Sequence, residues 1–181
     1  MKRVIFKVKL KNREIAEEKL DREGVDLSAI FWLHDRVYVP RGYERGKNYP
    51  RLVMRTEMRA VDEPPKYILI LRRHIEDSGI DVVEKTVVLD YVAAVNMILQ
   101  LGFRPAGEVS RRRQNAIFRE TYVCFDEIDG KEGSFMKVEG GILEKETVEE
   151  VRTRILGLTE ELIGGKIENA GEVIEKPYSE M

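Results

Sequence analysis

Apolar and polar residues alternate along several stretches of the chain with the period of two that is typical of β-strands. The first is residues 3–11, where one face is apolar and the other carries Ile5, Lys7 and Lys9. Because side chains on one face of a strand point the same way, both ammonium groups are expected to enter the same space.

Further strands are predicted wherever the alternation recurs between turn-forming residues. They cover residues 51–58, 66–73, 81–89, 109–118, 121–128 and 135–139. Residues 25–39 are less regular and predict a short strand or a buried loop, and residues 40–50 form a basic loop.

Three helices are predicted from apolar spacings of three and four and from their end signals. Asn12 caps a helix that runs through Leu20, and Asp90 caps one that ends at Gly102. A third begins at the capping box Thr147-x-x-Glu150 and ends at residues 164–165.

The order of these elements is strand, helix, several strands, helix, several strands, helix. Short connections between successive strands favour antiparallel pairing, so the predicted class is α+β with an antiparallel sheet curled into a barrel. A length of 181 residues suits one domain, covering residues 1–181.

Basic residues gather on one face of residues 109–118. Arg111 and Arg113 point to one side of this strand, and Ser110 and Arg112 to the other. Two guanidinium groups on one face repel each other unless an anion lies between them, although a solvated edge strand would also account for the pattern.

Composition limits the classes of function. The formal net charge is −2, so no bulk field attracts nucleic acid or membrane, and an anion site requires local segregation of charge. Cys124 is the single cysteine and is interpreted as a small core residue, while His34 and His74 are isolated and are interpreted as structural. No secretory signal, membrane-spanning run, P-loop or dinucleotide fingerprint is seen, which favours a cytoplasmic protein without a membrane partner.

Taken together, the motifs resemble those of the CYTH family, also called triphosphate tunnel metalloenzymes, over nearly the whole chain. The motifs that carry the resemblance are Val8-Lys9-Leu10-Lys11, Leu52-Val53-Met54-Arg55, Leu69-Ile70-Leu71-Arg72, Leu101-Gly102-Phe103, Val109-x-Arg111-x-Arg113, Phe125-Asp126-Glu127-Ile128, Phe135-x-Lys137-x-Glu139 and the final Pro177-Tyr178-Ser179-Glu180-Met181.

The resemblance implies a closed tunnel of eight antiparallel strands with flanking helices, which binds a triphosphorylated small molecule together with Mg²⁺ or Mn²⁺. The family includes class IV adenylyl cyclases and thiamine triphosphatases. Carried over by motif, the phosphate-binding residues are Lys7, Lys9, Arg55, Arg72, Arg111, Arg113 and Lys137, with Lys9 and Arg55 assigned to catalysis, and the metal ligands are Glu84, Asp126 and Glu139.

The chain departs from the family pattern at metal-binding positions. Ile5 and Lys7 stand where the family's first strand has glutamates, and Lys137 replaces the first glutamate of Phe-x-Glu-x-Glu. Val53 and Thr86 replace a further arginine and a further acid. Basic candidates for the inward face therefore outnumber acidic ones seven to three.

Three functions remain open from the sequence. The first is a metal-dependent cyclase or triphosphatase, and the second is a degenerate relative that binds a phosphorylated ligand without turnover. The third, nucleic-acid or polyanion binding through residues 111–113, 72–74 and 41–47, is disfavoured by the scattered charge. Internal pairing of the tunnel charges is the structural alternative to all three, and a homodimer is the default assembly.

Overall fold

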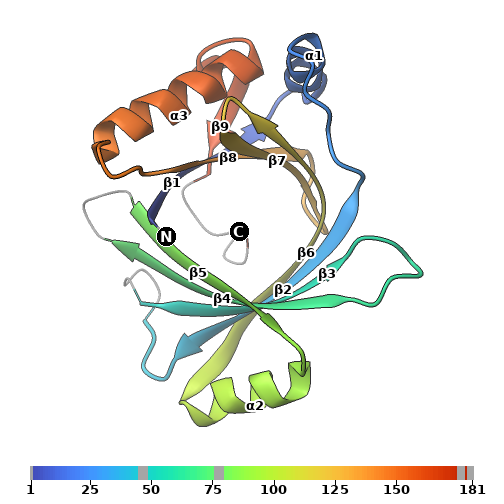
Figure 1. Ribbon diagram of the computed structural model, residues 1–181, viewed down its shortest axis with the longest axis vertical. Coiled ribbons are helices and arrows are strands. Elements are labelled where there is room, and N and C mark those ends of the chain that lie inside the picture. Colours follow the sequence, from blue (N-terminus) through green and yellow to red (C-terminus); the bar gives the residue numbers. More distant parts are fainter. Residues whose placement is uncertain (1, 45–48, 76–79, 175–177, 179–181) are drawn as a thin grey trace.

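An eight-stranded antiparallel sheet closes on itself to form a ring (Figure 1). The computed structural model describes all residues except 1, 45–48, 76–79, 175–177 and 179–181. Its strands are β1 (Lys2–Leu10), β2 (Phe31–Pro40), β3 (Arg51–Met58), β4 (Lys66–Ile75), β5 (Ile80–Val88), β6 (Phe103–Phe118), β7 (Thr121–Ile128), β8 (Ser134–Gly141) and the short β9 (Gly171–Val173). The helices are α1 (Glu14–Arg22), α2 (Tyr91–Gln100), α3 (Val148–Ile163) and α4 (Ile167–Ala170).

The strand order around the ring is β5-β4-β3-β2-β6-β7-β8-β1, and β1 pairs with β5 to close it. The predicted α+β class and eight-stranded closed sheet are confirmed. The sequence did not predict β9, which adds to the edge of β1, or the four-residue α4.

Two boundaries differ from the sequence prediction. Most of the irregular stretch 25–39 belongs to a ten-residue strand, β2, which extends to Pro40 and pairs with β3 and β6. Strand β6 begins at Phe103, well before the predicted start at Val109, because β2 continues to pair with it along this extension. The predicted basic loop 40–50 lies partly outside the described residues.

The predicted helix signals make the expected hydrogen bonds. The Asp90 side chain accepts a hydrogen bond from the backbone N–H of Ala93 at 2.9 Å. At α3, the Thr147 hydroxyl accepts a hydrogen bond from the backbone N–H of Glu150. In return, the Glu150 carboxylate accepts one from the backbone N–H of Thr147. The Asn12 side chain accepts from the backbone N–H of Glu14 at 2.9 Å, at the start of α1.

The helices cover the outer surface of the ring, on two sides. On one side, α1 and α3 pack with the outward apolar residues of β1, β6, β7 and β8, around buried side chains such as Leu20, Phe125, Met136 and Ile155. On the other side, α2 places Ala94 and Ile98 against Tyr38 of β2 and Met54 of β3. The hydrophobic core therefore lies mainly outside the ring, which leaves the inner face for other chemistry.

A smaller apolar cluster lies where β2, β3, β4 and β5 meet. It consists of Val37, Val53, Ile70 and Val83, one from each strand. On each of these strands a charged residue lies two positions from the apolar one and therefore on the same face. One part of the inner face is thus packed with apolar side chains, and the rest is polar. Within the described residues, no helix is long and apolar enough to span a membrane.

Candidate anion-binding tunnel

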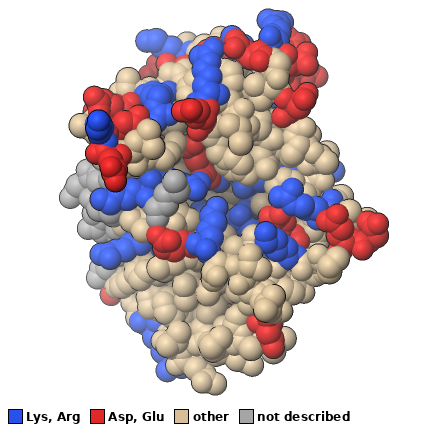
Figure 2. Space-filling view, in the orientation of Figure 1, with Lys and Arg blue, Asp and Glu red and all other residues tan. Residues whose placement is uncertain are grey.

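Charged side chains from most strands of the ring point into its interior. Alternation along each strand places them there, because their sequence neighbours on either side face the outer core. Figure 2 shows Lys and Arg residues gathered around the hollow at the middle of one face. The interior cations include Arg3, Lys7, Arg55, Arg72, Lys85, Arg111, Arg113 and Lys137, and the interior carboxylates are those of Asp35, Asp126 and Glu139.

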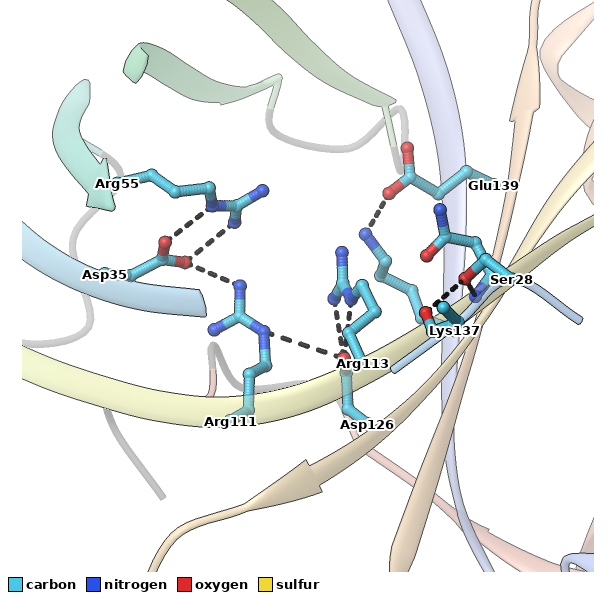
Figure 3. A network of polar contacts seen from close by, with 10 residues as sticks. Ser28, Asp35, Arg55, Arg111, Arg113, Asp126, Lys137 and Glu139 are labelled. Carbon is cyan, nitrogen blue, oxygen red and sulfur yellow. Dashed lines mark hydrogen bonds and ion pairs between the residues drawn. The ribbon is translucent and has the colours of Figure 1, made fainter. Parts of the chain in front are cut away.

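Asp35 of β2 joins two arginines from neighbouring strands (Figure 3). Its Oδ1 accepts from Arg55 Nε at 2.6 Å, and its Oδ2 accepts from Arg55 Nη2 at 2.8 Å and from Arg111 Nη2 at 2.7 Å. All three side chains are buried. Burial alone would raise the pKa of Asp35, but the two guanidinium groups outweigh it and hold that pKa well below its usual range.

Asp126 of β7 pairs with Arg113 of β6 through two hydrogen bonds. Arg113 Nε donates to Oδ1 and Nη2 donates to Oδ2, both at 2.6 Å. Arg111 Nε lies 3.7 Å from the same Oδ1. Burial opposes ionisation of Asp126, yet Arg113, Arg111 and Lys137 hold its pKa below the ordinary value, so the carboxylate is charged at neutral pH.

Glu139 of β8 accepts hydrogen bonds from two cations. Lys137, two residues earlier on the same face, donates through Nζ, and Arg3 of β1 donates through Nη1 at 2.8 Å. Burial would raise the pKa of Glu139, but these partners lower it well below the usual range. Burial also lowers the pKa of Lys137, against the attraction of Glu139.

Arg72 and Lys85 differ from the other interior cations, because within the described residues neither makes a hydrogen bond or an ion pair. The buried Nε of Arg72 has no acceptor. Burial, together with repulsion from Arg55 and Arg111, lowers the pKa of Arg72, against the attraction of Asp35 and Glu139. Lys85 is itself solvent-exposed, and its partial burial lowers its pKa from 10.5 to about 8, although Glu139 raises it.

One aromatic side chain from the C-terminal region lies among these cations. The Tyr178 ring has its centroid 5.7 Å from that of Phe135, 5.6 Å from Lys7 Nζ and 5.8 Å from Arg111 Cζ. Among the residues that the structure describes, its buried hydroxyl has no hydrogen-bond partner. Burial, with the charge of Asp126 nearby, raises the pKa of this phenol, so it stays a neutral donor.

Most of the residues selected from the sequence are brought together by the ring. Arg55, Arg111, Arg113, Asp126, Lys137 and Glu139 form one charged region with Arg72 and Lys7 at its sides. Lys9 lies farther along β1, where its Cε is close to Gly133 in the turn between β7 and β8. Glu84 is exposed and occupies the face of β5 opposite Lys85, so it does not join Asp126 and Glu139.

Sequence reasoning missed Asp35, Arg3, Lys85 and Tyr178 as interior groups. A signal for Asp35 was present, because Phe31, Leu33, Val37 and Val39 share its face of β2. A single carboxylate on an otherwise apolar strand face requires a partner, and Arg55 and Arg111 supply it.

The interior does not fit the Mg²⁺ or Mn²⁺ ion that the family resemblance implies. Asp126 is fully buried behind Arg113, and the oxygens of Glu139 are engaged by Lys137 and Arg3. In the described part of the chain, no three His, Cys, Asp or Glu side chains are grouped so that they could hold a metal ion. Mg²⁺ relies on carboxylate and phosphate oxygens, and here ammonium and guanidinium groups already contact the carboxylates.

Several solved structures have a fold similar to that of this chain. A Vibrio parahaemolyticus protein described as a "putative adenylate cyclase" matches with a TM-score of 0.77 and 16% identity over 98% of this chain and 95% of that one. The PH1012 protein of Pyrococcus horikoshii matches with a TM-score of 0.76 and 20% identity over 98% of both chains. A Hippeastrum protein with a dominant triphosphatase activity matches with a TM-score of 0.57 and 13% identity over 90% of this chain and 88% of that one.

No family model matches the sequence, and no curated protein matches it. At these identities the structural matches establish the fold alone. The chain has the CYTH-like fold that its motifs predicted, and its activity has to be argued from its own interior.

Proposed function

We propose that the interior of the ring binds a phosphorylated small molecule of the triphosphate class, and that this binding needs no divalent metal ion. The observation that carries the proposal is the buried Nε of Arg72, which has no acceptor within the described residues and is repelled by other cations close to it. A guanidinium group in this position is repelled by Arg55 and Arg111, and an anion would relieve that repulsion.

The interior offers several donors of the kind that phosphate oxygens accept. Arg72 presents a fork of N–H groups, Lys85 an ammonium and Tyr178 a neutral hydroxyl, all without acceptors among the described residues. Hydrogen bonds from cationic donors to phosphate are short and strong, and two or three of them fix the orientation of the ligand. A chain of phosphates suits the site better than a single one, because cations are contributed by strands around the ring.

Lysine side chains account for the independence from metal. In metal-dependent phosphoryl transfer the ion neutralises charge that the phosphates bring. Lys137 beside Glu139 and Lys85 on β5 supply fixed positive charge in the interior instead. The result expected is binding without rapid turnover, since a lysine ammonium can neutralise phosphate charge but cannot coordinate a water molecule and lower its pKa as a metal ion does.

Thermal unfolding tests this proposal directly. Tripolyphosphate, ATP and thiamine triphosphate are each added with Mg²⁺, with Mn²⁺ and with EDTA. A ligand at 100 times its Kd stabilises a protein by about 2.7 kcal/mol, which raises the melting temperature of a chain of this size by roughly 5–10 °C. We expect an equal rise in EDTA and in metal. A rise that strictly requires metal contradicts metal independence, and no rise with any ligand contradicts anion binding.

Metal-dependent turnover is the second candidate. It is favoured by the interior position of Asp126 and Glu139 and by the triphosphatase activity of the Hippeastrum protein with a related fold. It requires both carboxylates to exchange their cationic partners for a metal ion when the ligand enters. Release of phosphate or pyrophosphate that EDTA abolishes would favour this function over the first.

A further inference from the structure

A serine, a histidine and a glutamate meet on the outer face of the ring, away from the charged interior. Strands β2 and β6 pair there, in the wall between α1 and α2 (Figure 1). Asp35 and Arg111 point inward, so their sequence neighbours His34 and Ser110 point outward. Although nothing near it in the sequence predicts a partner, His34 lies directly opposite Ser110 across the two strands.

The contacts of His34 are those of a general base with an orienting carboxylate. His34 Nδ1 lies 2.8 Å from Ser110 Oγ, and His34 Nε2 lies 3.6 Å from Glu108 Oε2. A carboxylate beside Nε2 favours the tautomer that carries its proton there, which leaves the lone pair of Nδ1 to accept the serine proton. Arg36 Nε holds the other oxygen of Glu108 at 2.6 Å. The separation of 3.6 Å exceeds a hydrogen bond, as is common for catalytic contacts before substrate binds.

Groups able to bind a reacting ester surround Ser110. The Arg112 guanidinium is two residues along the same face, and among the described residues Glu127 is its one ion-pair partner, so further N–H donors remain for a developing oxyanion. A pocket of about 330 Å³, lined in part by Arg112, Asp129 and Ser134, opens on this side. Asp129 places the pocket next to the serine, because its backbone N–H donates to the Ser110 carbonyl at 3.0 Å. The buried Ser134 hydroxyl has no partner within the described residues and can donate to a ligand.

Trp32 supplies an apolar surface beside these groups. Its side chain is 44% exposed, it lies directly opposite Arg112 on β6, and it is two residues from His34 on the same face of β2. The face of an exposed indole ring packs well against another flat ring. The arrangement therefore suits an ester whose alcohol is aromatic and whose acyl group is small enough for the neighbouring pocket.

We propose that Ser110, His34 and Glu108 form a hydrolytic site for carboxylic esters of a small acid and an aromatic alcohol, separate from the interior of the ring. Ser110 Oγ attacks the ester carbonyl carbon and passes its proton to His34 Nδ1. The bond between that carbon and the alcohol oxygen breaks, and the departing alcohol takes the proton from His34. Water then attacks the acyl group on Ser110, returns a proton through His34 to Ser110 Oγ, and releases the carboxylic acid.

Release of p-nitrophenol from p-nitrophenyl acetate tests this site. General-base catalysis contributes roughly 10²–10⁴-fold, so Ser110→Ala and His34→Gln should each lower the rate of the full chain by about tenfold or more. His74→Gln is the matched control, since it removes the other of the two histidines, on β4, and should keep the wild-type rate. Phenylmethylsulfonyl fluoride forms a sulfonyl ester with an activated serine and releases fluoride. It should modify the peptide that contains Ser110 in the wild type and leave that peptide of His34→Gln unmodified.

Four results would overturn the proposal. They are equal rates for the wild type and Ser110→Ala, equal losses in the two histidine variants, modification at a different serine, and inhibition by tripolyphosphate, which would move the hydrolysis into the ring. Ser110 and His34 are partly exposed, so their variants should unfold at the wild-type temperature, and a loss of rate then reports chemistry rather than folding.

Discussion

Arg113 and Asp126 form a two-point ion pair across β6 and β7, with both hydrogen bonds at 2.6 Å and both side chains buried. The family resemblance assigned Arg113 to a phosphate and Asp126 to a metal ion. In this structure Arg113 and Asp126 instead bind each other. Asp35 likewise binds Arg55, and Glu139 binds Lys137. Among the described residues, the cations without partners are therefore the ones available to the proposed anion, whereas the paired cations bind carboxylates of the ring.

Removal of one charge from a buried pair should destabilise the protein. Asp126→Asn leaves the Arg113 guanidinium buried without a counter-charge, so we expect a loss of roughly 3–5 kcal/mol in the free energy of unfolding. Denaturant titration measures the change, with Asp129→Asn in the exposed turn as the control. A loss below about 1 kcal/mol would show that water reaches Arg113 and that the pair contributes little.

Loss of Arg72 should affect ligand binding and leave stability intact. Because its Nε has no acceptor and neighbouring cations repel it, Arg72→Gln should unfold at the same temperature as the wild type or slightly higher. The rise in melting temperature caused by tripolyphosphate should fall by more than half. Arg73→Gln changes the next residue, which is exposed on the other face of β4, and should keep the full rise. Equal behaviour of the two variants would remove Arg72 from the site.

A carboxylate at position 137 should make binding depend on metal. Lys137→Glu places two acids side by side on β8 in the order that the family motif has, Phe-x-Glu-x-Glu. Without metal the two carboxylates repel each other, and we expect weaker tripolyphosphate binding in EDTA and recovery on addition of Mg²⁺. Lys137→Gln, which removes the charge without adding an acid, is the control. Weak binding of the glutamate variant that Mg²⁺ does not restore would argue that the interior cannot take an ion.

The titration of Lys85 should make stability and binding respond to alkaline pH in opposite directions. Its pKa is about 8 in the folded chain, against an ordinary value of 10.5. Between these values the unfolded chain binds more protons, so stability contributed by this group rises with pH. Phosphate binding favours the ammonium form, so affinity for tripolyphosphate should fall over the same range. Lys85→Gln should flatten both profiles, measured by thermal unfolding and calorimetry from pH 7 to 10, and unchanged profiles would exclude Lys85 as the source.

Two glycines should respond to alanine in opposite ways. A Cβ on Gly140 of β8 would lie 2.5 Å from Ile155 Cδ1 and 2.9 Å from Ile155 Cγ1, in the closely packed contact with α3. We expect Gly140→Ala to cost about 1–3 kcal/mol of stability. A Cβ on Gly157 meets nothing within 4 Å, so Gly157→Ala should stabilise α3 by about 0.5–1 kcal/mol. Chemical denaturation compares them, and a stable Gly140→Ala protein would show that α3 can shift away from β8.

Local physics in the sequence determined most of the strands, the helix ends and several of the strand faces. The caps at Asp90 and Thr147 are local hydrogen bonds, and the alternation at residues 109–118 correctly placed Arg111 and Arg113 on one buried side. These features depend on residues no more than a few positions apart. That is why the fold class could be predicted from them, whereas the inward direction of the basic residues was implied by the family resemblance.

The tertiary structure alone decided which face of β5 turns inward and which charges meet. Residues 82–88 have valines on both faces, so their pattern does not choose between Glu84 and Lys85, and pairing with β1 and β4 does. A shift of one residue exchanges the two faces of a strand. The pairing in this structure turns Glu84, the expected metal ligand, outward and turns the cationic Lys85 inward. The pairing of Asp35 with Arg55 and Arg111 likewise joins residues that are 20 and 76 positions apart in sequence. Only the hydrogen-bond register of the strands in the closed ring brings such distant residues together.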